Sequence, residues 1–188
     1  WGFDPFGDDD IAVRGVLVHE CFREVRSADA IATEAQRAAL LERARRRAAV
    51  EKCRPIDGER GRRMLEDVAG LLARCAAGPV AAALRPAAST LVFTELPFVR
   101  ESPEGLVHGR IDRLELLVDA AEASPVAAVI VDYKTGATGV SAGQLAEKRR
   151  VYLEQLEGYA AAVGEMYRLP RSQIRLRLVF VDRGEVLE

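Results

Sequence analysis

Two charged side chains at the end of an apolar stretch are the residues of this chain best placed to do chemistry. Residues 126–131 are continuously apolar, and Asp132, Tyr133 and Lys134 follow them directly. In a β-strand, residues two apart leave the same face, so the Asp132 carboxylate and the Lys134 ammonium should be neighbours. A structural ion pair is one interpretation. Burying charge there is costly without full pairing or a function.

The choice of lysine in this pair is informative. Only three of the 27 basic residues are lysines, namely Lys52, Lys134 and Lys148. A chain that otherwise uses arginine has here placed a compact ammonium, which can sit beside a water molecule. The pattern therefore favours a reactive site at the end of this strand.

A second carboxylate belongs to the segment Gly109-Arg110-Ile111-Asp112-Arg113, which lies on the preceding predicted strand. Consecutive antiparallel strands usually pair, so Asp112 and Asp132 can converge. Two converging carboxylates are what Mg²⁺ accepts while it keeps water molecules for a phosphate substrate. The alternative is that Asp112 is a surface ion-pair residue, because Arg110 and Arg113 flank it.

Further polar residues could complete such a site. His19 lies on a predicted helix and offers an imidazole nitrogen as a third metal ligand, although a lone helical histidine is more often a packing residue. Gln155 and Tyr159 are four apart on a predicted helix, so their amide and phenol share one face. That face could point to the site or to a nucleic-acid backbone, or it could pack on a sheet.

The elements that position these residues divide the chain into a helical first part and a β-rich second part. Turn signals at Pro55, Asp57 and Gly58 and at Gly78-Pro79 separate helical patterns over residues 14–26, 29–53, 59–77 and a short piece reaching 84. Later patterns predict strands over residues 90–100, 106–118, 126–131 and 174–182, with a long helix over residues 142–167.

Four short motifs follow one another along these elements. They are Gly15-x-x-x-His19, Gly109-Arg110-Ile111-Asp112, Val131-Asp132-Tyr133-Lys134-Thr135-Gly136 and Gln155-x-x-x-Tyr159. Together they resemble the nuclease core of the PD-(D/E)XK superfamily, and in particular its RecB/AddA branch. The resemblance covers residues 14–182. It implies an α/β restriction-endonuclease-like core, with a mixed central β-sheet flanked by helices in αβββαβ order and an N-terminal helical extension.

The resemblance also implies one nuclease domain over residues 1–188, with a mainly helical part at 14–84 and the αβ core at 90–183. The implied activity is Mg²⁺- or Mn²⁺-dependent hydrolysis of DNA phosphodiester bonds, with Lys134 positioning or deprotonating the attacking water. Glu95, on the first strand, corresponds to an acidic position of the family; it could support the metal or be an ordinary strand glutamate. The implied metal ligands are His19, Asp112, Asp132 and the backbone carbonyl of Tyr133.

The expected partners follow from the same resemblance. They are DNA, as single strands or duplex ends, an upstream helicase domain and a partner subunit in break repair and recombination. The motor itself is not in this sequence, which has no GxxxxGK[ST] phosphate loop. A non-cleaving binding module and an RNA endonuclease are the alternative interpretations. No iron–sulfur cluster is expected, because no trio of cysteines stands near the C-terminus.

The bulk composition fits a domain of this kind. The 188 residues carry a net charge of −2, are 49% hydrophobic and contain no apolar run near the ~20 residues that span a bilayer. The odd cysteines Cys21, Cys53 and Cys75 are expected to be reduced packing residues of a protein of the bacterial cytoplasm. Many arginines lie between residues 37 and 74. They could form a solvated helical face or a surface that binds nucleic-acid phosphates. The start at Trp1 suggests a piece of a longer protein.

Overall fold

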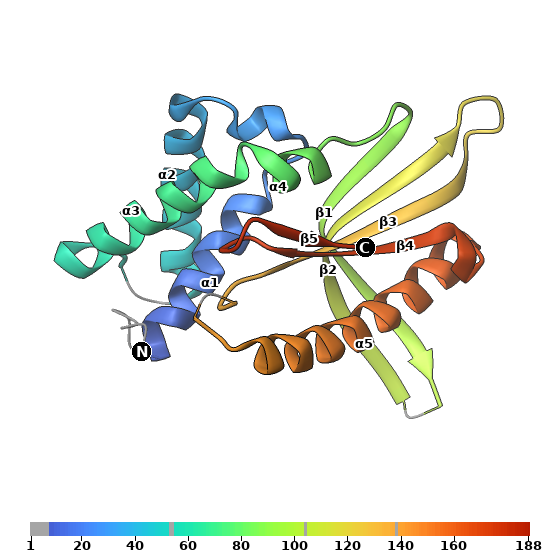
Figure 1. The fold of residues 1–188 in the computed structure, drawn as a ribbon. Helices are drawn as coiled ribbons and strands as arrows, with labels where there is room; N and C mark the ends of the chain where they lie inside the picture. Colours follow the sequence, from blue (N-terminus) through green and yellow to red (C-terminus); the bar gives the residue numbers. More distant parts are fainter. Residues whose placement is uncertain (1–7, 53–54, 104, 138) are drawn as a thin grey trace. The chain divides into compact units, whose positions relative to one another are not determined.

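The computed structural model describes residues 8–52, 55–103, 105–137 and 139–188. It has a mixed α/β fold with an N-terminal helical part and a five-stranded sheet, consistent with a restriction-endonuclease-like fold (Figure 1). Three strands, a long helix and two further strands follow the helical part in that order. The fold class predicted from the sequence is therefore confirmed.

The sheet consists of five strands in the order β1-β2-β3-β4-β5. Strands β1 and β2 form an antiparallel hairpin, and β2 pairs antiparallel with β3. Their bounds are β1 Thr90–Ser102, β2 Gly105–Asp119, β3 Ser124–Lys134, β4 Ile174–Phe180 and β5 Glu185–Leu187. Strand β5 was not predicted, because three residues are too few to show an alternating pattern.

The helical part contains four α-helices and a 3-10 turn among the described residues. They are α1 Asp8–Phe22, η1 Ala28–Ile31, α2 Glu34–Glu51, α3 Gly58–Cys75 and α4 Gly78–Ala83. The helix predicted over residues 29–53 is present as α2, but its predicted start was wrong, because Thr33 and Gln36 form a capping box that starts α2 after η1. Cys53, at the predicted end of that helix, lies outside the described residues.

The chain folds into two compact units that interleave along the sequence. Unit 1 comprises the residues up to Arg85 together with Lys134–Gly139 and Phe180–Glu185. Unit 2 comprises Pro86–Tyr133, Val140–Val179 and Val186–Glu188. Each unit is described below by itself, and the assignment of residues 1–188 to one nuclease domain stays a prediction.

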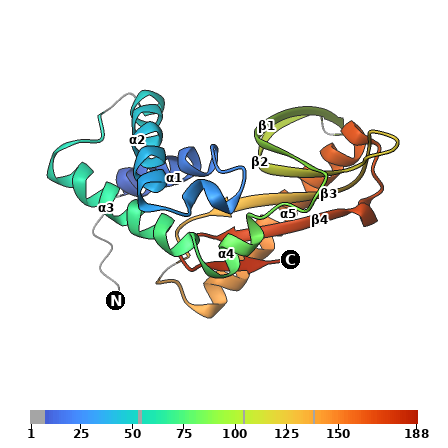
Figure 2. The ribbon, with the colours of Figure 1, turned by 90° about the horizontal axis from the view of Figure 1, so that it is seen from above.

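Unit 1 has a core in which α1, α2 and α3 contact one another (Figure 2). Its buried cysteines, Cys21 and Cys75, are free thiols. Burial raises the pKa of each to about 12, so both thiols stay protonated and unreactive. The prediction that these two are reduced packing residues is therefore confirmed.

The arginine-rich segment of unit 1 is a set of ion-paired helical faces. Arg46 bonds Glu42 at 2.9 Å and Arg62 bonds Glu66 at 2.7 Å, both at i,i+4 spacing. Arg47 reaches across from α2 to Glu20 on α1. Neighbouring glutamates thus match much of the arginine charge, which favours the solvated-face interpretation over a phosphate-tracking surface.

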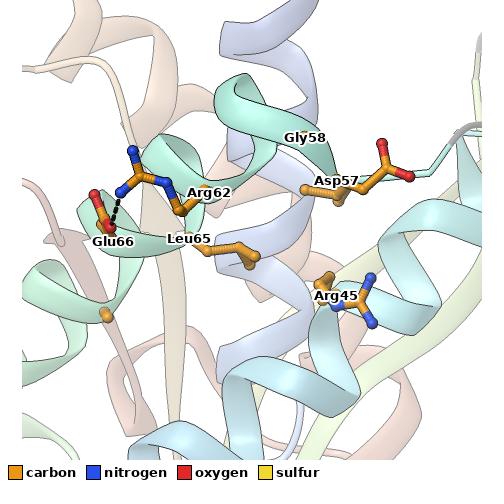
Figure 3. Close-up of a pocket in the computed structure, with 8 residues that line it drawn as sticks. Arg45, Asp57, Gly58, Arg62, Leu65 and Glu66 are labelled. Carbon is orange, nitrogen blue, oxygen red and sulfur yellow. Dashed lines mark hydrogen bonds and ion pairs between the residues drawn. The ribbon is translucent and has the colours of Figure 1, made fainter.

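A shallow depression of about 450 Å³ lies at the start of α3 in unit 1 (Figure 3). Ile56 and Leu65 contribute apolar walls, and Arg62 at its rim is paired with Glu66. The described residues that line it include none of the predicted site residues. Elsewhere, no helix in the described part of the chain is long and apolar enough to cross a bilayer.

Unit 2 contains the β1–β3 meander and α5, Ala142–Tyr167, whose bounds are those predicted (Figure 1). A capping box between Ser141 and Gln144 starts this helix. Its buried face includes Leu156 and Val163, and it contacts β1 within the unit. The meander and α5 together position most of the candidate site.

Candidate functional site

The pairing of β2 with β3 brings the two predicted carboxylates together. Arg113 pairs with Val131, so the next step of the two antiparallel strands places Asp112 beside Asp132. The backbone N–H of Tyr133 donates to Oδ2 of Asp112 at 2.8 Å. Asp132 is only 2% exposed, and Asp112 is half-buried. The convergence inferred from the strand order is therefore present in unit 2.

Glu95 on β1 supplies a third carboxylate to the same place. Thr94 pairs with Arg113 and Leu96 with Ile111, so Glu95 lies opposite Asp112. An oxygen of each carboxylate lies within 4.8 Å of the other. Glu95, Asp112 and Asp132 thus occupy neighbouring positions on three paired strands of unit 2.

The backbone of Glu95 has an uncommon conformation. Its φ is +53°, in the left-handed region that residues other than glycine rarely adopt. Such a conformation costs on the order of 1 kcal/mol and persists where the surrounding structure enforces it, often at functional sites. No sequence pattern marks this feature, which is why the sequence left the role of Glu95 open.

Substitutions at Glu95 should separate its backbone strain from its carboxylate. We expect Glu95→Gly to be about 1 kcal/mol more stable than Glu95→Ala, the reverse of the usual order in a strand, because glycine tolerates positive φ. Both variants should bind Mn²⁺ more weakly than the wild type. Thermal unfolding and calorimetric titration measure the two effects.

Ser89, whose φ is +59°, provides the matched control for Glu95. Ser89→Gly should likewise exceed Ser89→Ala in stability, but neither change should alter Mn²⁺ affinity. Wild-type Mn²⁺ affinity in Glu95→Ala would show that this carboxylate takes no part in metal binding.

The two arginines that flank Asp112 bind other acids. Arg110 donates to Glu95 at 3.1 Å, and the fully buried Arg113 donates to Glu115 at 2.7 Å. A buried charge pair of this kind needs such close hydrogen bonding to offset its desolvation. Arg113 and Glu115 therefore belong to the interior of unit 2, while Arg110 holds the Glu95 carboxylate at the surface.

Tyr133 contributes through its backbone, while its ring packs in the interior. The residue is 1% exposed, and burial raises the pKa of its phenol well above the usual range. A ring so placed packs in the interior rather than contacts substrate. The Tyr133 N–H orients Asp112, a contribution that the sequence did not reveal.

In unit 1, the loop after Lys134 is held by the residues that follow β4. The Val181 N–H donates to the Lys134 carbonyl at 3.1 Å. Asp182 Oδ2 accepts the Ala137 N–H at 2.8 Å, and Arg183 donates to the Ala137 carbonyl at 3.5 Å. Asp182 thus positions the loop that follows the Asp-x-Lys strand, a role that sequence reasoning missed because no motif includes it.

His19 lies on the last turn of α1, also in unit 1. A Cβ built on Gly15 would lie 3.7 Å from Oγ1 of Thr135, so this part of α1 lies against the loop after Lys134. Gly15 and His19 are four apart and share a helix face. The helix face that carries the Gly15-x-x-x-His19 motif therefore lies against that loop.

The comparison with protein families decides the assignment. The sequence profile of the PD-(D/E)XK nuclease superfamily matches residues 5–188. The chain belongs to the PD-(D/E)XK nuclease superfamily. Membership implies a metal-dependent nuclease, a hydrolase whose substrate is nucleic acid. No curated protein was found to match the chain.

The acidic cluster fits the divalent metal ion that this superfamily uses. Like charges placed opposite each other on paired strands are destabilising, and Asp112 faces both Asp132 and Glu95. A bound cation would offset that repulsion. Carboxylate oxygens are hard ligands suited to Mg²⁺ or Mn²⁺. The donor set in unit 2 is therefore chemically appropriate for a PD-(D/E)XK metal site.

The Gln155-x-x-x-Tyr159 motif of this PD-(D/E)XK nuclease both packs and presents polar groups. The Tyr159 ring meets Phe98 edge to face, with ring centroids 5.6 Å apart. Its hydroxyl is hydrogen-bonded to the exposed side chain of Gln155. The packing interpretation therefore holds for the Tyr159 ring, whereas Gln155 is exposed on α5 and donates its amide N–H to the Tyr159 hydroxyl.

Gly109 begins the motif of Asp112 because the two rings leave no room for a side chain. It pairs with Phe98 across the hairpin, and an added Cβ would lie 2.7 Å from the Phe98 ring and 3.6 Å from Tyr159. The glycine thus allows α5 and the β1–β2 hairpin to pack closely against each other.

Replacing Gly109 by alanine should destabilise the fold. We expect Gly109→Ala to lower the free energy of unfolding by about 1–3 kcal/mol through overpacking against Phe98. Gly158→Ala is the matched control, since a Cβ there meets nothing within 4 Å and alanine favours the helix. Urea unfolding compares the two. Equal stabilities would contradict the close packing over Gly109.

Proposed function

We propose that this nuclease hydrolyses DNA phosphodiester bonds, as the nuclease module of a RecB/AddA-like helicase–nuclease. The observation that carries the proposal is that Glu95, Asp112 and Asp132 occupy neighbouring positions on three paired strands of unit 2, with an oxygen of Glu95 within 4.8 Å of one of Asp112. Gly15-x-x-x-His19 and Gln155-x-x-x-Tyr159 support the RecB/AddA assignment by their resemblance to that branch.

In this proposal, Mg²⁺ or Mn²⁺ is held by His19, Asp112, Asp132 and the backbone carbonyl of Tyr133. Glu95 supports the same ion from β1. When bound, the ion supplies Lewis-acid chemistry that neutralises charge on the phosphate. The role of each ligand follows from its donor atoms: carboxylate and carbonyl oxygens and one imidazole nitrogen.

Lys134 is the proposed catalytic residue that acts on water. Because Asp132 and Lys134 both lie on β3, two residues apart, their side chains leave the same face of that strand. Lys134 would orient the attacking water as an ammonium, or take its proton as a neutral amine. Cleavage of the 3′ P–O bond then leaves a 5′-phosphate and a 3′-hydroxyl end.

The cellular context is also part of the proposal. The module would act on single strands or duplex ends delivered by an upstream helicase, with a partner subunit, during break repair and recombination. Its place would be the bacterial cytoplasm, beside the nucleoid. The free thiols of Cys21 and Cys75 accord with that reducing compartment.

The test is a cleavage assay with labelled single-stranded DNA, duplex DNA and single-stranded RNA. Each substrate is incubated with Mg²⁺, Mn²⁺ or EDTA. We expect cutting of DNA that requires the metal ion. Preferential cutting of RNA would assign the same site to an RNA endonuclease. Mn²⁺ binding without any cutting would favour the alternative of a non-cleaving binding module.

A further inference from the structure

Three consecutive residues that follow β4 hold the loop after Lys134, all within unit 1. The Val181 N–H donates to the Lys134 carbonyl at 3.1 Å, and the Ala137 N–H donates to Oδ2 of Asp182 at 2.8 Å. Arg183 donates to the Ala137 carbonyl at 3.5 Å. Val181, Asp182 and Arg183 are called the loop clamp below. The clamp thus binds the loop at both of its ends, Lys134 and Ala137.

The loop clamp is itself anchored in the interior of unit 1. Val181 is fully buried, and its carbonyl accepts the thiol of Cys75, at the end of α3, at 3.5 Å. Arg183 also binds Glu185 at 2.7 Å. Ala137, which the clamp holds, is only 1% exposed. Because a packed interior has little freedom to move, the clamp can impose a defined position on the loop.

A glycine makes the loop depend on these contacts. Gly136 lies between the two clamped residues and has a φ of +76°, in the left-handed region that suits glycine. Glycine has more backbone freedom than other residues, so contacts from outside the loop are needed to order it. Lys134 directly precedes this flexible segment, and its carbonyl is one of the clamped groups. The direction of the Lys134 side chain at the end of β3 therefore depends on the clamp.

We propose that Asp182 is a positioning residue for Lys134, and that it controls the rate of phosphodiester cleavage through the clamped loop. The inference rests on the proposed function, in which Lys134 acts on the attacking water. A carboxylate that accepts a backbone N–H makes a charge-assisted hydrogen bond, which is stronger than a neutral one. A displacement of about 1 Å at a catalytic group can cost about 10²-fold in rate. Loss of the Asp182 contact should therefore slow cleavage while the metal ligands stay in place.

The first test is single-turnover cleavage together with calorimetric titration of Mn²⁺. Asp182→Ala should slow cleavage by about 10- to 100-fold and leave Mn²⁺ affinity within a few-fold of wild type. Asp182→Asn should restore most of the rate, because its amide oxygen can still accept the Ala137 N–H. In a Lys134→Ala background, Asp182→Ala should cause little further loss, since residues that act as a unit are not additive. A full additional loss in the double variant would overturn the proposal.

Val68→Ala is the matched control for a general loss of stability, because Val68 is fully buried on α3 and truncation leaves a cavity. It should lower the melting temperature but leave the cleavage rate of the folded protein unchanged. Circular dichroism melting selects an assay temperature at which every variant is folded. An Asp182→Ala variant that does not fold is replaced by Asp182→Leu, which fills the space without a hydrogen-bond acceptor.

The second test reads the position of Lys134 without cleavage. The chain contains only three lysines, Lys52, Lys134 and Lys148, so reductive ¹³C-methylation gives one lysine signal for each. Lysine-to-arginine variants assign these signals in the NMR spectrum. Asp182→Ala should shift the Lys134 signal and its titration with pH, and Asp182→Asn should restore both. The signals of the other two lysines should stay unchanged.

The two tests distinguish this inference from the proposed function. Wild-type cleavage by Asp182→Ala, or an unchanged Lys134 signal in that variant, would overturn the positioning role. Equal cleavage rates for Asp182→Asn and Asp182→Ala would also overturn it, because the acceptor would then be irrelevant. A Lys134 signal that depends on Asp182, in a protein that cuts no substrate, would support the positioning of Lys134 and refute the nuclease.

Discussion

Lys134→Ala should reduce the rate of phosphodiester cleavage by about 10²- to 10⁴-fold while Mn²⁺ affinity stays within a few-fold of wild type. The magnitude is that of a side chain that transfers or positions a proton in the transition state. Metal affinity should survive because the carboxylates of Glu95, Asp112 and Asp132, which lie on paired strands of unit 2, do not depend on the ammonium. Single-turnover cleavage and calorimetric titration provide the two readouts.

Two further variants make the Lys134 experiment specific. Lys134→Arg keeps the positive charge but replaces a compact ammonium by a planar guanidinium, so activity should remain well below wild type. Lys52→Ala removes an exposed lysine at the end of α2 and should change neither readout. Full cleavage in Lys134→Ala would remove this residue from the mechanism, and loss of Mn²⁺ binding would make it a structural residue.

Part of the site could be predicted from two signals. One is that side chains two residues apart on a strand share a face, and the other is the order of the strands along the chain. The apolar run before Asp132 predicted β3. The order of the strands in the sequence predicted that β3 pairs with the strand of Asp112, and the pairing of Arg113 with Val131 confirms it. The bounds of α5 were predictable because the helix begins at a capping box and Pro170 follows its end. Each of these signals is local in the sequence.

The contributions that were not predictable depend on contacts between distant residues. The positive φ of Glu95 reflects the pairing of its neighbours Thr94 and Leu96 with β2, which no local propensity encodes. Asp182 accepts a hydrogen bond from Ala137, which is 45 residues away in sequence. The start of α2 is a different case, since the spacing of Thr33 and Gln36 in its capping box is a local signal in the sequence.

The effect of Asp112→Asn on the free energy of unfolding should change sign when Mn²⁺ is added. The amide oxygen of asparagine can still accept the Tyr133 N–H, so the contact between β2 and β3 is retained. In EDTA, loss of one charge from the acidic cluster relieves repulsion and should raise the free energy of unfolding by about 0.5–1 kcal/mol. In Mn²⁺, the wild type should be the more stable protein.

The reversal arises because a ligand that binds only the folded state stabilises it by RT ln(1 + [L]/Kd). This is about 2.7 kcal/mol at an Mn²⁺ concentration of 100 times Kd, and far less for a variant whose Kd is raised about 10- to 100-fold. Cleavage by Asp112→Asn should fall by at least about 10²-fold. Thermal unfolding in EDTA and in Mn²⁺ measures the sign change directly.

Asp119→Asn is the matched control, because it makes the same substitution on the same strand at an exposed position. Its response to Mn²⁺ should equal that of the wild type. A residue with a purely structural role would change stability equally with and without metal, so only a ligand can reverse the order. Equal stabilisation of wild type and Asp112→Asn by Mn²⁺ would place the ion elsewhere.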